Sequence, residues 1–244
     1  MTVTELKAQL DAEYPIRIEM HAHSHPISPC SEVSVEELAK TYSTLGYHAV
    51  VLTNHYLLDL PIFADMDKEQ ALDCYTGAYE DFSEECEKHG MKALLGCEIR
   101  FNENPNDYLI YGVDRDVLSV AYDYFEKGLE AYRTEVKLDK SVFLQAHPKR
   151  NGMTEMNAEL FDGIESFNMH PGHNSRVGIA VKYAKENDLK IKIAGSDFHH
   201  PGKQHEGVSA LRTRFLPKDS FELAEILKSG DYLLEIGGDS LIIA

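Results

Sequence analysis

Apolar runs of strand length alternate with segments of helical periodicity along almost the whole chain. We expect strands over residues 16–20, 48–53, 91–97, 108–113, 141–146, 161–167 and 190–194. Between them we expect helices over residues 34–45, 67–89, 116–137 and 176–187, with further helices over 3–13 and 220–229 and an extended segment over 208–215. Strands that alternate with helices predict βαβ units and a mostly parallel sheet. About seven strands are enough to close such a sheet into a barrel.

No linker, repeat or low-complexity stretch divides the 244 residues, so we expect one domain over residues 1–244. The chain has 24 basic and 41 acidic residues and a formal net charge of −17. Such a protein is a poor partner for long nucleic acids and for anionic membranes. Residues 1–14 lack the apolar core of a signal peptide, and no apolar run could span a bilayer. Four cysteines without a CxxC spacing are expected to be reduced and inert, which together predicts a cytoplasmic protein.

Histidines and carboxylates stand where several of these strands are expected to end. They are His21 and His23, His55, Glu98, His147, and Asp197 with His199. Side chains two residues apart on a strand point to the same face, so His21 and His23 can bind one ion. In α/β barrels the chemistry lies where strands end and the following loops begin. The pattern therefore predicts a metal site at one rim of a barrel.

Imidazole and carboxylate ligands together suit manganese, iron or zinc. The candidate ligands exceed what one ion needs, so we expect two or three divalent ions, with Glu98 as a bridging ligand. Such ions acidify a bound water and stabilise the attacking and leaving oxygens of an in-line displacement. We expect hydrolysis of a phosphate ester by a metal-activated hydroxide, held in place by Glu98, His55 and Asp197.

Five short motifs follow the order found in the PHP (polymerase and histidinol phosphatase) superfamily. They are His21-x-His23, Thr53-Asn54-His55, Gly96-Cys97-Glu98, Ala146-His147-Pro148 and Gly195-Ser196-Asp197-Phe198-His199. The chain resembles this superfamily from about residue 16 to residue 215. The resemblance implies a single-domain, distorted TIM-like (β/α)7 barrel with a phosphoesterase site of two or three metal ions. It also implies the metal ligands, which are His21, His23, His55, Glu98, His147, Asp197 and His199.

One strand begins, instead of ending, with a candidate ligand. The superfamily often has a histidine at the start of the strand after the bridging glutamate, and this chain has Asp107 there. A carboxylate can also bind a hard divalent ion. We expect Asp107 to replace that histidine as a metal ligand.

Two other motif positions depart from the superfamily. A further ligand expected after the His-x-His motif falls on Ser28 or Pro29, and neither is a good ligand. Whether His25 or Glu32 compensates stays open. Asn54 stands where an aspartate is usual, which keeps hydrogen-bonding capacity and removes a negative charge near the site.

Basic and histidine side chains in the same rim loops are candidate substrate contacts. They are Lys149, Arg150 and Arg176, which suit a phosphate or carboxylate group, together with His170 and His173. We expect His200 and His205 to be polar loop residues, and Glu165 to support the ligands without being one. The sequence has no Walker-type loop, GxGxxG pattern or GxSxG elbow, so nothing supports ATP, NAD or a serine nucleophile.

These features together predict a metal-dependent phosphoesterase that acts on a small phosphorylated substrate. Histidinol phosphate, suggested by the resemblance, and a nucleotide are the candidate substrates. Two alternatives stay open. One is an amidohydrolase-like metal enzyme that cleaves C–N or lactone bonds, although no ligand lysine is evident. The other is a non-catalytic metal-binding regulatory module, which the missing ligand at Ser28 or Pro29 favours. The oligomeric state also stays open.

Overall fold

The strands form two hydrogen-bonded sheets in the computed structural model, which describes residues 1–202 and 206–243. The first sheet has the order β12-β11-β10-β1-β2-β4, and the second has the order β3-β5-β6-β7-β8-β9. The first consists of β1 (Ile16–Ala22), β2 (Ala49–Leu52), β4 (Lys92–Leu95), β10 (Ser209–Thr213), β11 (Leu233–Ile236) and β12 (Ser240–Ile243). The second consists of β3 (His55–Tyr56), β5 (Cys97–Ile99), β6 (Tyr108–Tyr111), β7 (Val142–Gln145), β8 (Gly163–Asn168) and β9 (Ile191–Gly195).

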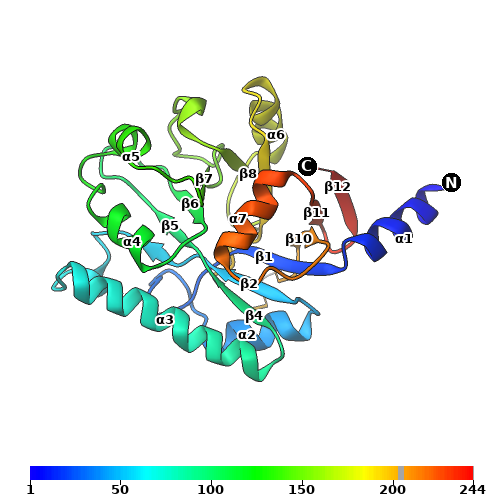
Figure 1. Ribbon diagram of the computed structural model, residues 1–244, viewed down its shortest axis with the longest axis horizontal. Coiled ribbons are helices and arrows are strands. Elements are labelled where there is room, and N and C mark those ends of the chain that lie inside the picture. The colour runs from blue at the N-terminus through cyan, green and yellow to red at the C-terminus, as the bar shows by residue number, and fades with distance from the viewer. Residues whose placement is uncertain (203–205, 244) are drawn as a thin grey trace.

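The two sheets are halves of one distorted ring of strands (Figure 1). Along the chain, β3 follows closely on β2 and β5 follows closely on β4, so two strand lines pass from the first sheet into the second. On the other side, the Phe198 N–H donates to the carbonyl of His21 (3.1 Å), and Ala22 forms an isolated parallel bridge with Phe198. This arrangement confirms the predicted α/β fold with parallel strands. Among the described residues, no continuous ladder closes the ring.

Strand β6 runs antiparallel to both of its neighbours, β5 and β7. The loop between β5 and β6 contains no helix, and it is too short for the crossover that a parallel pair requires. The strands β10, β11 and β12 also pair antiparallel, as an extension beside β1. The sheet is therefore less uniformly parallel than the sequence pattern predicts. The reversal of β6 brings its first residues to the rim where the other ring strands end.

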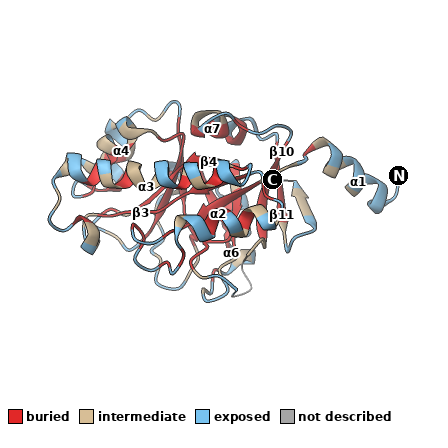
Figure 2. Ribbon diagram, turned by 90° about the horizontal axis from the view of Figure 1, so that it is seen from below, coloured by how far each residue is buried: buried red, intermediate tan, exposed pale blue. Residues whose placement is uncertain are grey.

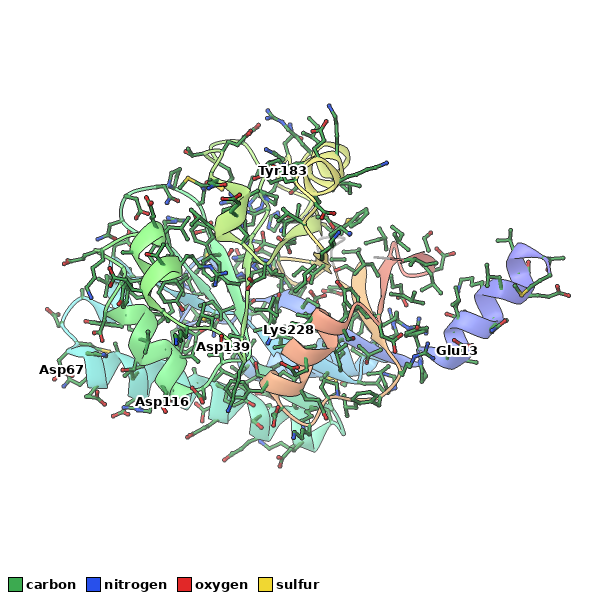
Figure 3. All side chains as sticks on the ribbon, turned by 45° about the horizontal axis from the view of Figure 1, so that its top comes forward. Glu13, Asp67, Asp116, Asp139, Tyr183 and Lys228 are labelled. Atoms are coloured by element: carbon green, nitrogen blue, oxygen red, sulfur yellow. The ribbon has the colours of Figure 1, made fainter. Side chains whose placement is uncertain are left out.

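Helices cover the outer face of the strands, with their buried sides turned inward (Figure 2). They are α2 (Val35–Thr44), α3 (Lys68–Lys88), α4 (Arg115–Tyr122), α5 (Leu129–Glu135), α6 (Val177–Glu186) and α7 (Ser220–Ser229). The remaining helix, α1 (Val3–Glu13), does not cover the strands, and short 3₁₀ turns lie at Pro61–Phe63 and Ala158–Leu160. The expected capping box of α2 is present, because Ser34 and Glu37 exchange side-chain and backbone hydrogen bonds. Acidic side chains lie at helix starts, such as Asp67 at α3 and Asp116 at α4 (Figure 3). Their negative charge interacts favourably with the positive end of the helix dipole.

One expected helical region is divided into two helices. The helical region expected over 116–137 is split into α4 and α5, and Gly128 between them has a φ of +93° that favours glycine. At the other end of the molecule, α1 projects from the body and buries none of its residues (Figure 1). None of the helices in the described part of the chain has the length and apolar character needed to cross a membrane.

An apolar core fills the ring below the rim. Ile18, Leu109, Leu144 and Ile193 come from four different strands and are buried in one cluster. The Tyr111 hydroxyl crosses this interior and donates to the carbonyl of Met20 (2.9 Å). Packed side chains close the interior, and the candidate ligands lie where the strands emerge from it.

Candidate metal centre

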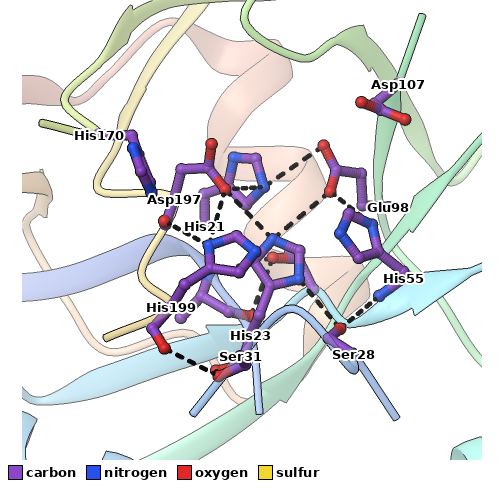
Figure 4. A network of polar contacts seen from close by, with 12 residues as sticks. His21, His23, Ser28, Ser31, His55, Glu98, Asp107, His170, Asp197 and His199 are labelled. Carbon is purple, nitrogen blue, oxygen red and sulfur yellow. Dashed lines mark hydrogen bonds and ion pairs between the residues drawn. The ribbon is translucent and has the colours of Figure 1, made fainter. Parts of the chain in front are cut away.

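The expected ligands converge at one rim, and the Glu98 carboxylate lies among them (Figure 4). Its Oε2 atom lies 2.9 Å from Nδ1 of His55 and 3.4 Å from Nε2 of His23. Its Oε1 atom lies 3.1 Å from Nε2 of His147 and 3.5 Å from Nε2 of His21. Each oxygen therefore faces a different pair of imidazoles. A carboxylate that bridges two ions needs this geometry.

Asp197 completes the ring of ligands from the turn after β9. Its Oδ1 atom lies 3.5 Å from Nε2 of His21 and 3.4 Å from Nε2 of His23. The same atom lies 3.4 Å from Nδ1 of His199. Asp197 has a φ of +52° and His147 a φ of +27°, in the left-handed region that non-glycine residues seldom adopt. Strained backbone of this kind is concentrated at functional sites.

Several buried polar atoms at this rim have no hydrogen-bond partner. They include Nε2 of His21, Nε2 of His23 and Oε2 of Glu98. Three overlapping groups have ligand atoms within 4.8 Å of one another, namely His23, His55 and His199; His21, His23 and Glu98; and Glu98, Asp107 and His147. Burying unpaired polar atoms is costly, so atoms arranged in this way fit a bound cation. The donor set of imidazoles and carboxylates suits manganese, iron or zinc.

The charges of these groups stabilise one another. Burial would raise the pKa of Glu98, but His21 and His55 hold it well below its usual range. Burial would lower the pKa of His55, but Glu98 raises it to about 10. Against the same effect of burial, Glu165 and its acidic neighbours raise the pKa of His21 well above its usual value. Burial lowers the pKa of His23. Without metal, His21 and His55 therefore hold protons at neutral pH.

Glu165 lies behind the ligands and contacts three parts of the site. Its Oε1 atom lies 2.9 Å from Nδ1 of His21, and its Oε2 atom accepts the backbone N–H of His147 (3.0 Å). Asn168 donates from Nδ2 both to Glu165 (3.0 Å) and to Oδ2 of Asp197 (3.1 Å). Glu165 therefore leaves Nε2 of His21 free to face a metal ion. Asn168 was not among the expected site residues, although it lies three residues after Glu165 on the same strand.

Ser28 stands where the sequence lacks a ligand, and it acts through hydrogen bonds. Its hydroxyl oxygen lies 3.2 Å from Nδ1 of His23 and accepts the backbone N–H of His55 (2.9 Å). The hydroxyl donates to Oδ1 of Asn54 (2.9 Å). Ser28 thus holds the back of one imidazole and the backbone of another. Asn54 supports that serine and provides no ligand.

Cys30 lies closer to the site than expected for an inert thiol. Its side chain hydrogen-bonds with His199 and His55. Burial opposes the thiolate, but these hydrogen bonds lower the pKa of Cys30 to about 6. The only signal in the sequence was its position next to the motif residues Ser28 and Pro29.

Asp107 reaches the site from the start of β6. Its Oδ2 atom lies 3.6 Å from Nε2 of His147. Both carboxylate oxygens also contact guanidinium groups, because Oδ1 lies 2.7 Å from Nη2 of Arg100 and Oδ2 lies 3.1 Å from Nη2 of Arg150. Arg100 was not among the expected site residues, although a spacing of two residues from Glu98 directs both side chains to one face of an extended segment.

Two of the expected substrate contacts have partners outside the ligand cluster. Nζ of Lys149 lies 3.2 Å from Glu155 and 3.8 Å from the ring centre of Tyr183, on α6 at the edge of the molecule (Figure 3). Arg176 is exposed and donates to Oδ1 of Asn151 (2.6 Å). Neither side chain contacts a candidate metal ligand among the described residues.

Two histidines expected to contact substrate do lie beside the ligands. Nδ1 of His173 lies 3.2 Å from Oδ2 of Asp197. The ring of His170 stacks on that of His173 with a centroid distance of 3.7 Å (Figure 4 shows His170 near Asp197). Both residues are half-buried, so they can meet a molecule that enters from solvent.

Neither candidate for the missing ligand joins the cluster. His25 is exposed, and Oε2 of Glu32 lies 3.2 Å from Nδ1 of His200. His200 is therefore paired with Glu32, in the loop that follows the His21-x-His23 motif. His205 lies outside the described residues.

Comparison with known proteins now identifies the family. A profile of the PHP domain matches residues 19–194, which is more than half of the chain and contains most of the ligands described above. The chain belongs to the PHP domain family. No curated protein sequence matches it significantly. Metal binding in this PHP domain is supported by the geometry of its histidine and glutamate clusters.

Solved structures resemble this chain at low sequence identity, and one of them has a TM-score above 0.5. A two-domain protein from Bacteroides vulgatus, containing a predicted PHP-like metal-dependent phosphoesterase, has a TM-score of 0.56 and 16% identity, covering 91% of this chain and 65% of that one. A Bifidobacterium adolescentis protein, provisionally assigned as a metal-dependent phosphoesterase, has a TM-score of 0.48 and 16% identity over 77% of this chain and 89% of that one. An amidohydrolase from Chromobacterium violaceum with bound sulfate and no metal has a TM-score of 0.49 and 15% identity over 76% and 88%.

Proposed function

We propose that this PHP domain is a hydrolase of small phosphomonoesters that depends on divalent metal ions. The observation that carries the proposal is the pair of buried, unpartnered imidazole nitrogens, on His21 and His23, that face Glu98 and Asp197. If these histidines served only to stabilise the fold, their buried nitrogen atoms would be expected to have hydrogen-bond partners within the protein. Seven residues would hold the ions, namely His21, His23, His55, Glu98, His147, Asp197 and His199.

Different side chains would have different roles in the reaction. When bound, divalent ions supply an acidified water and Lewis-acid stabilisation of phosphoryl oxygens. Glu98 separates two ligand sets, since Oε1 faces His147 and Oε2 faces His55. The half-buried imidazole of His173 contacts Asp197. From there its ring can donate a proton to the alkoxide that leaves the phosphorus atom. Histidinol phosphate and mononucleotides are the substrates we propose first, and the acidic surface disfavours longer nucleic acids.

Phosphate release from a panel of phosphomonoesters tests this function. Metal-stripped protein would be reconstituted separately with manganese, iron and zinc, and assayed on L-histidinol phosphate, nucleoside 5′- and 3′-monophosphates and phenyl phosphate. We expect turnover only after metal is added. Glu98→Ala should lower kcat/KM by about a hundredfold or more, because loss of a supporting group alone costs up to that much.

Glu126→Ala, at an exposed glutamate, is the matched control and should keep its activity. Equal turnover in stripped protein, or in Glu98→Ala, would contradict the proposal. An amide and a lactone in the same panel separate the two other functions. Turnover of these alone would indicate an amidohydrolase-like enzyme, and bound metal without any turnover would indicate a regulatory module.

A further inference from the structure

Arg100 directly follows β5 and lies two residues after the central carboxylate, Glu98. Cys97 and Ile99 are buried in an apolar cluster, so Glu98 and Arg100 project to the opposite face. The β5–β6 register pairs Ile99 with Tyr108. The next pair outward is therefore Arg100 and Asp107. Arg100 and Asp107 therefore lie one pair of inward-facing residues further along the strands than Glu98, towards the open rim. We refer to this step as one layer.

Arg150 reaches the same place from a different loop. Its backbone N–H donates to the carbonyl of His147 (3.0 Å), in the tight turn that follows a candidate ligand. Its Nη2 atom then contacts Oδ2 of Asp107 (3.1 Å). On the other side, Arg100 contacts Oδ1 of Asp107 through Nε (2.8 Å) and Nη2 (2.7 Å). We call Arg100, Asp107 and Arg150 the arginine clamp.

The arginine clamp keeps donors free for another anion. A guanidinium has five N–H donors, and none of the described residues other than Asp107 accepts a hydrogen bond from the side chain of Arg100 or Arg150. The Arg100 side chain is 36% exposed and that of Arg150 is 20% exposed, so both are held in place and still reach solvent. Two guanidinium groups around one carboxylate leave a local positive charge in a protein of net charge −17. Planar, oriented guanidinium pairs suit phosphate and carboxylate groups.

The same contacts limit what Asp107 can do for a metal ion. Each of its oxygens is already paired with a guanidinium, and a cation at either oxygen would have to lie beside that positive charge. The Glu98, Asp107 and His147 group is therefore the least favourable of the three for metal binding. Asp107 is better placed to fix the directions of Arg100 and Arg150.

We propose that the arginine clamp binds a second anionic group of the substrate, one layer above the metal centre, and that Asp107 orients the arginines instead of binding metal. Two residues along a strand correspond to about 7 Å. The inference rests on the proposed function, because it assumes that the scissile phosphate lies at the level of Glu98. The substrate class is thus a small phosphomonoester that carries a further phosphate or carboxylate group about that far from its phosphorus atom.

Binding of non-hydrolysable phosphonates tests the clamp without any turnover. Titration calorimetry of manganese-loaded protein would compare phenylphosphonate, 4-phosphonobenzoate and 1,4-phenylenediphosphonate. We expect at least one of the two compounds with a second anionic group to bind about tenfold or more tightly than phenylphosphonate, the gain expected from a charged hydrogen bond. Which of the two is favoured tells a carboxylate from a phosphate. In Arg100→Gln and Arg150→Gln that ratio should fall towards one.

Arg115→Gln, at an arginine paired with Glu69 on the outer surface, is the matched control and should keep the ratio. Equal binding of all three compounds to the wild type, no binding of any, or an unchanged ratio in both clamp variants would overturn the proposal. A measurement of bound metal tests the role of Asp107 separately. Asp107→Asn should retain as many ions per chain as the wild type. Loss of one ion would make Asp107 a ligand and overturn its assigned role. If the phosphonates show the preference while neither the phosphate panel nor 4-carboxyphenyl phosphate shows any turnover, the proposed function fails and the clamp stands.

Discussion

Glu165 shows how one buried carboxylate can organise several ligands. It contacts the ring of His21, the backbone of His147 and, through Asn168, the carboxylate of Asp197. A hydrogen bond to the far nitrogen of an imidazole fixes the tautomer and the direction of its metal-binding nitrogen. In His21 this leaves Nε2, and not Nδ1, directed towards Glu98 and Asp197.

Replacing this carboxylate should weaken metal binding and leave the fold intact. In Glu165→Gln the amide oxygen can still face Nδ1 of His21, but the negative charge that favours this orientation is lost. We expect metal affinity to fall by about ten- to a hundredfold, the usual cost of losing such a supporting group. Competition with a chromogenic chelator measures the affinity, and circular dichroism checks the fold. Glu126→Gln is the control, and an unchanged affinity in Glu165→Gln would assign Glu165 to packing alone.

At the scale of elements, two features position the site residues. They are the antiparallel direction of β6 and the close approach of β1, β8 and β9. Because β6 runs antiparallel, Asp107 reaches the rim from the beginning of a strand, whereas Glu98 and His147 reach it from strand ends. On the opposite side, β1, β8 and β9 approach closely around Gly195. A Cβ atom on Gly195 would lie 2.5 Å from Cβ of His21 and would also overlap Oε1 of Glu165.

A methyl group at Gly195 should therefore disturb the site and the packing together. Overpacking of a tight interior typically costs about 1–3 kcal/mol, so Gly195→Ala should lower the free energy of unfolding by about that amount. It should also weaken metal binding, because the overlap falls on the contact between Glu165 and His21. Urea unfolding and chelator competition measure the two effects.

Gly77→Ala provides the control on the helix α3. No atom lies within 4 Å of a Cβ built at Gly77, and alanine is the better helix former by about 0.5–1 kcal/mol, so this variant should be neutral or stabilising. A Gly195→Ala variant that matched it in stability and in metal affinity would contradict the predicted close approach.

At the scale of the whole molecule, the site gathers protonated imidazoles and ionised carboxylates inside an acidic protein. Glu98 raises the pKa of His55 to about 10 against the effect of burial, and the pKa of His21 is also raised well above its usual value. A histidine whose pKa is raised on folding stabilises the fold fully below its unfolded pKa of about 6.5. That contribution is lost as the pH rises, through about 10 in the case of His55. The metal-free protein should accordingly lose stability between these two pH values.

Metal binding should show the opposite dependence on pH. An imidazole must lose its proton before it binds an ion, so His55, and His21 with its raised pKa, should release protons when metal binds. Metal affinity should therefore rise with pH. Calorimetry in two buffers of different ionisation enthalpy counts the protons. Glu98→Ala, which removes the partner of His55, should release fewer, and an absence of proton release in the wild type would contradict the assigned protonation.

The order of strands and helices, and the side chains placed at the strand ends, can be predicted from local sequence patterns. Apolar periodicity, caps such as Ser34 with Glu37, and the two-residue spacing of His21 and His23 are local properties, so they can be read along the chain. The convergence of His55, Glu98 and His147 then followed from the rule that strand ends share one rim.

Which of the remaining polar groups meet depends on the three-dimensional fold. It reversed β6, which placed Asp107 between Arg100 and Arg150, and it brought Cys30 to His55. It also directed Lys149 towards Tyr183 and Arg176 towards Asn151, away from the ligands. These outcomes depend on loop paths and on contacts between segments far apart in the chain. Local periodicity carries no information about such contacts, because their energy comes from partners that the fold supplies.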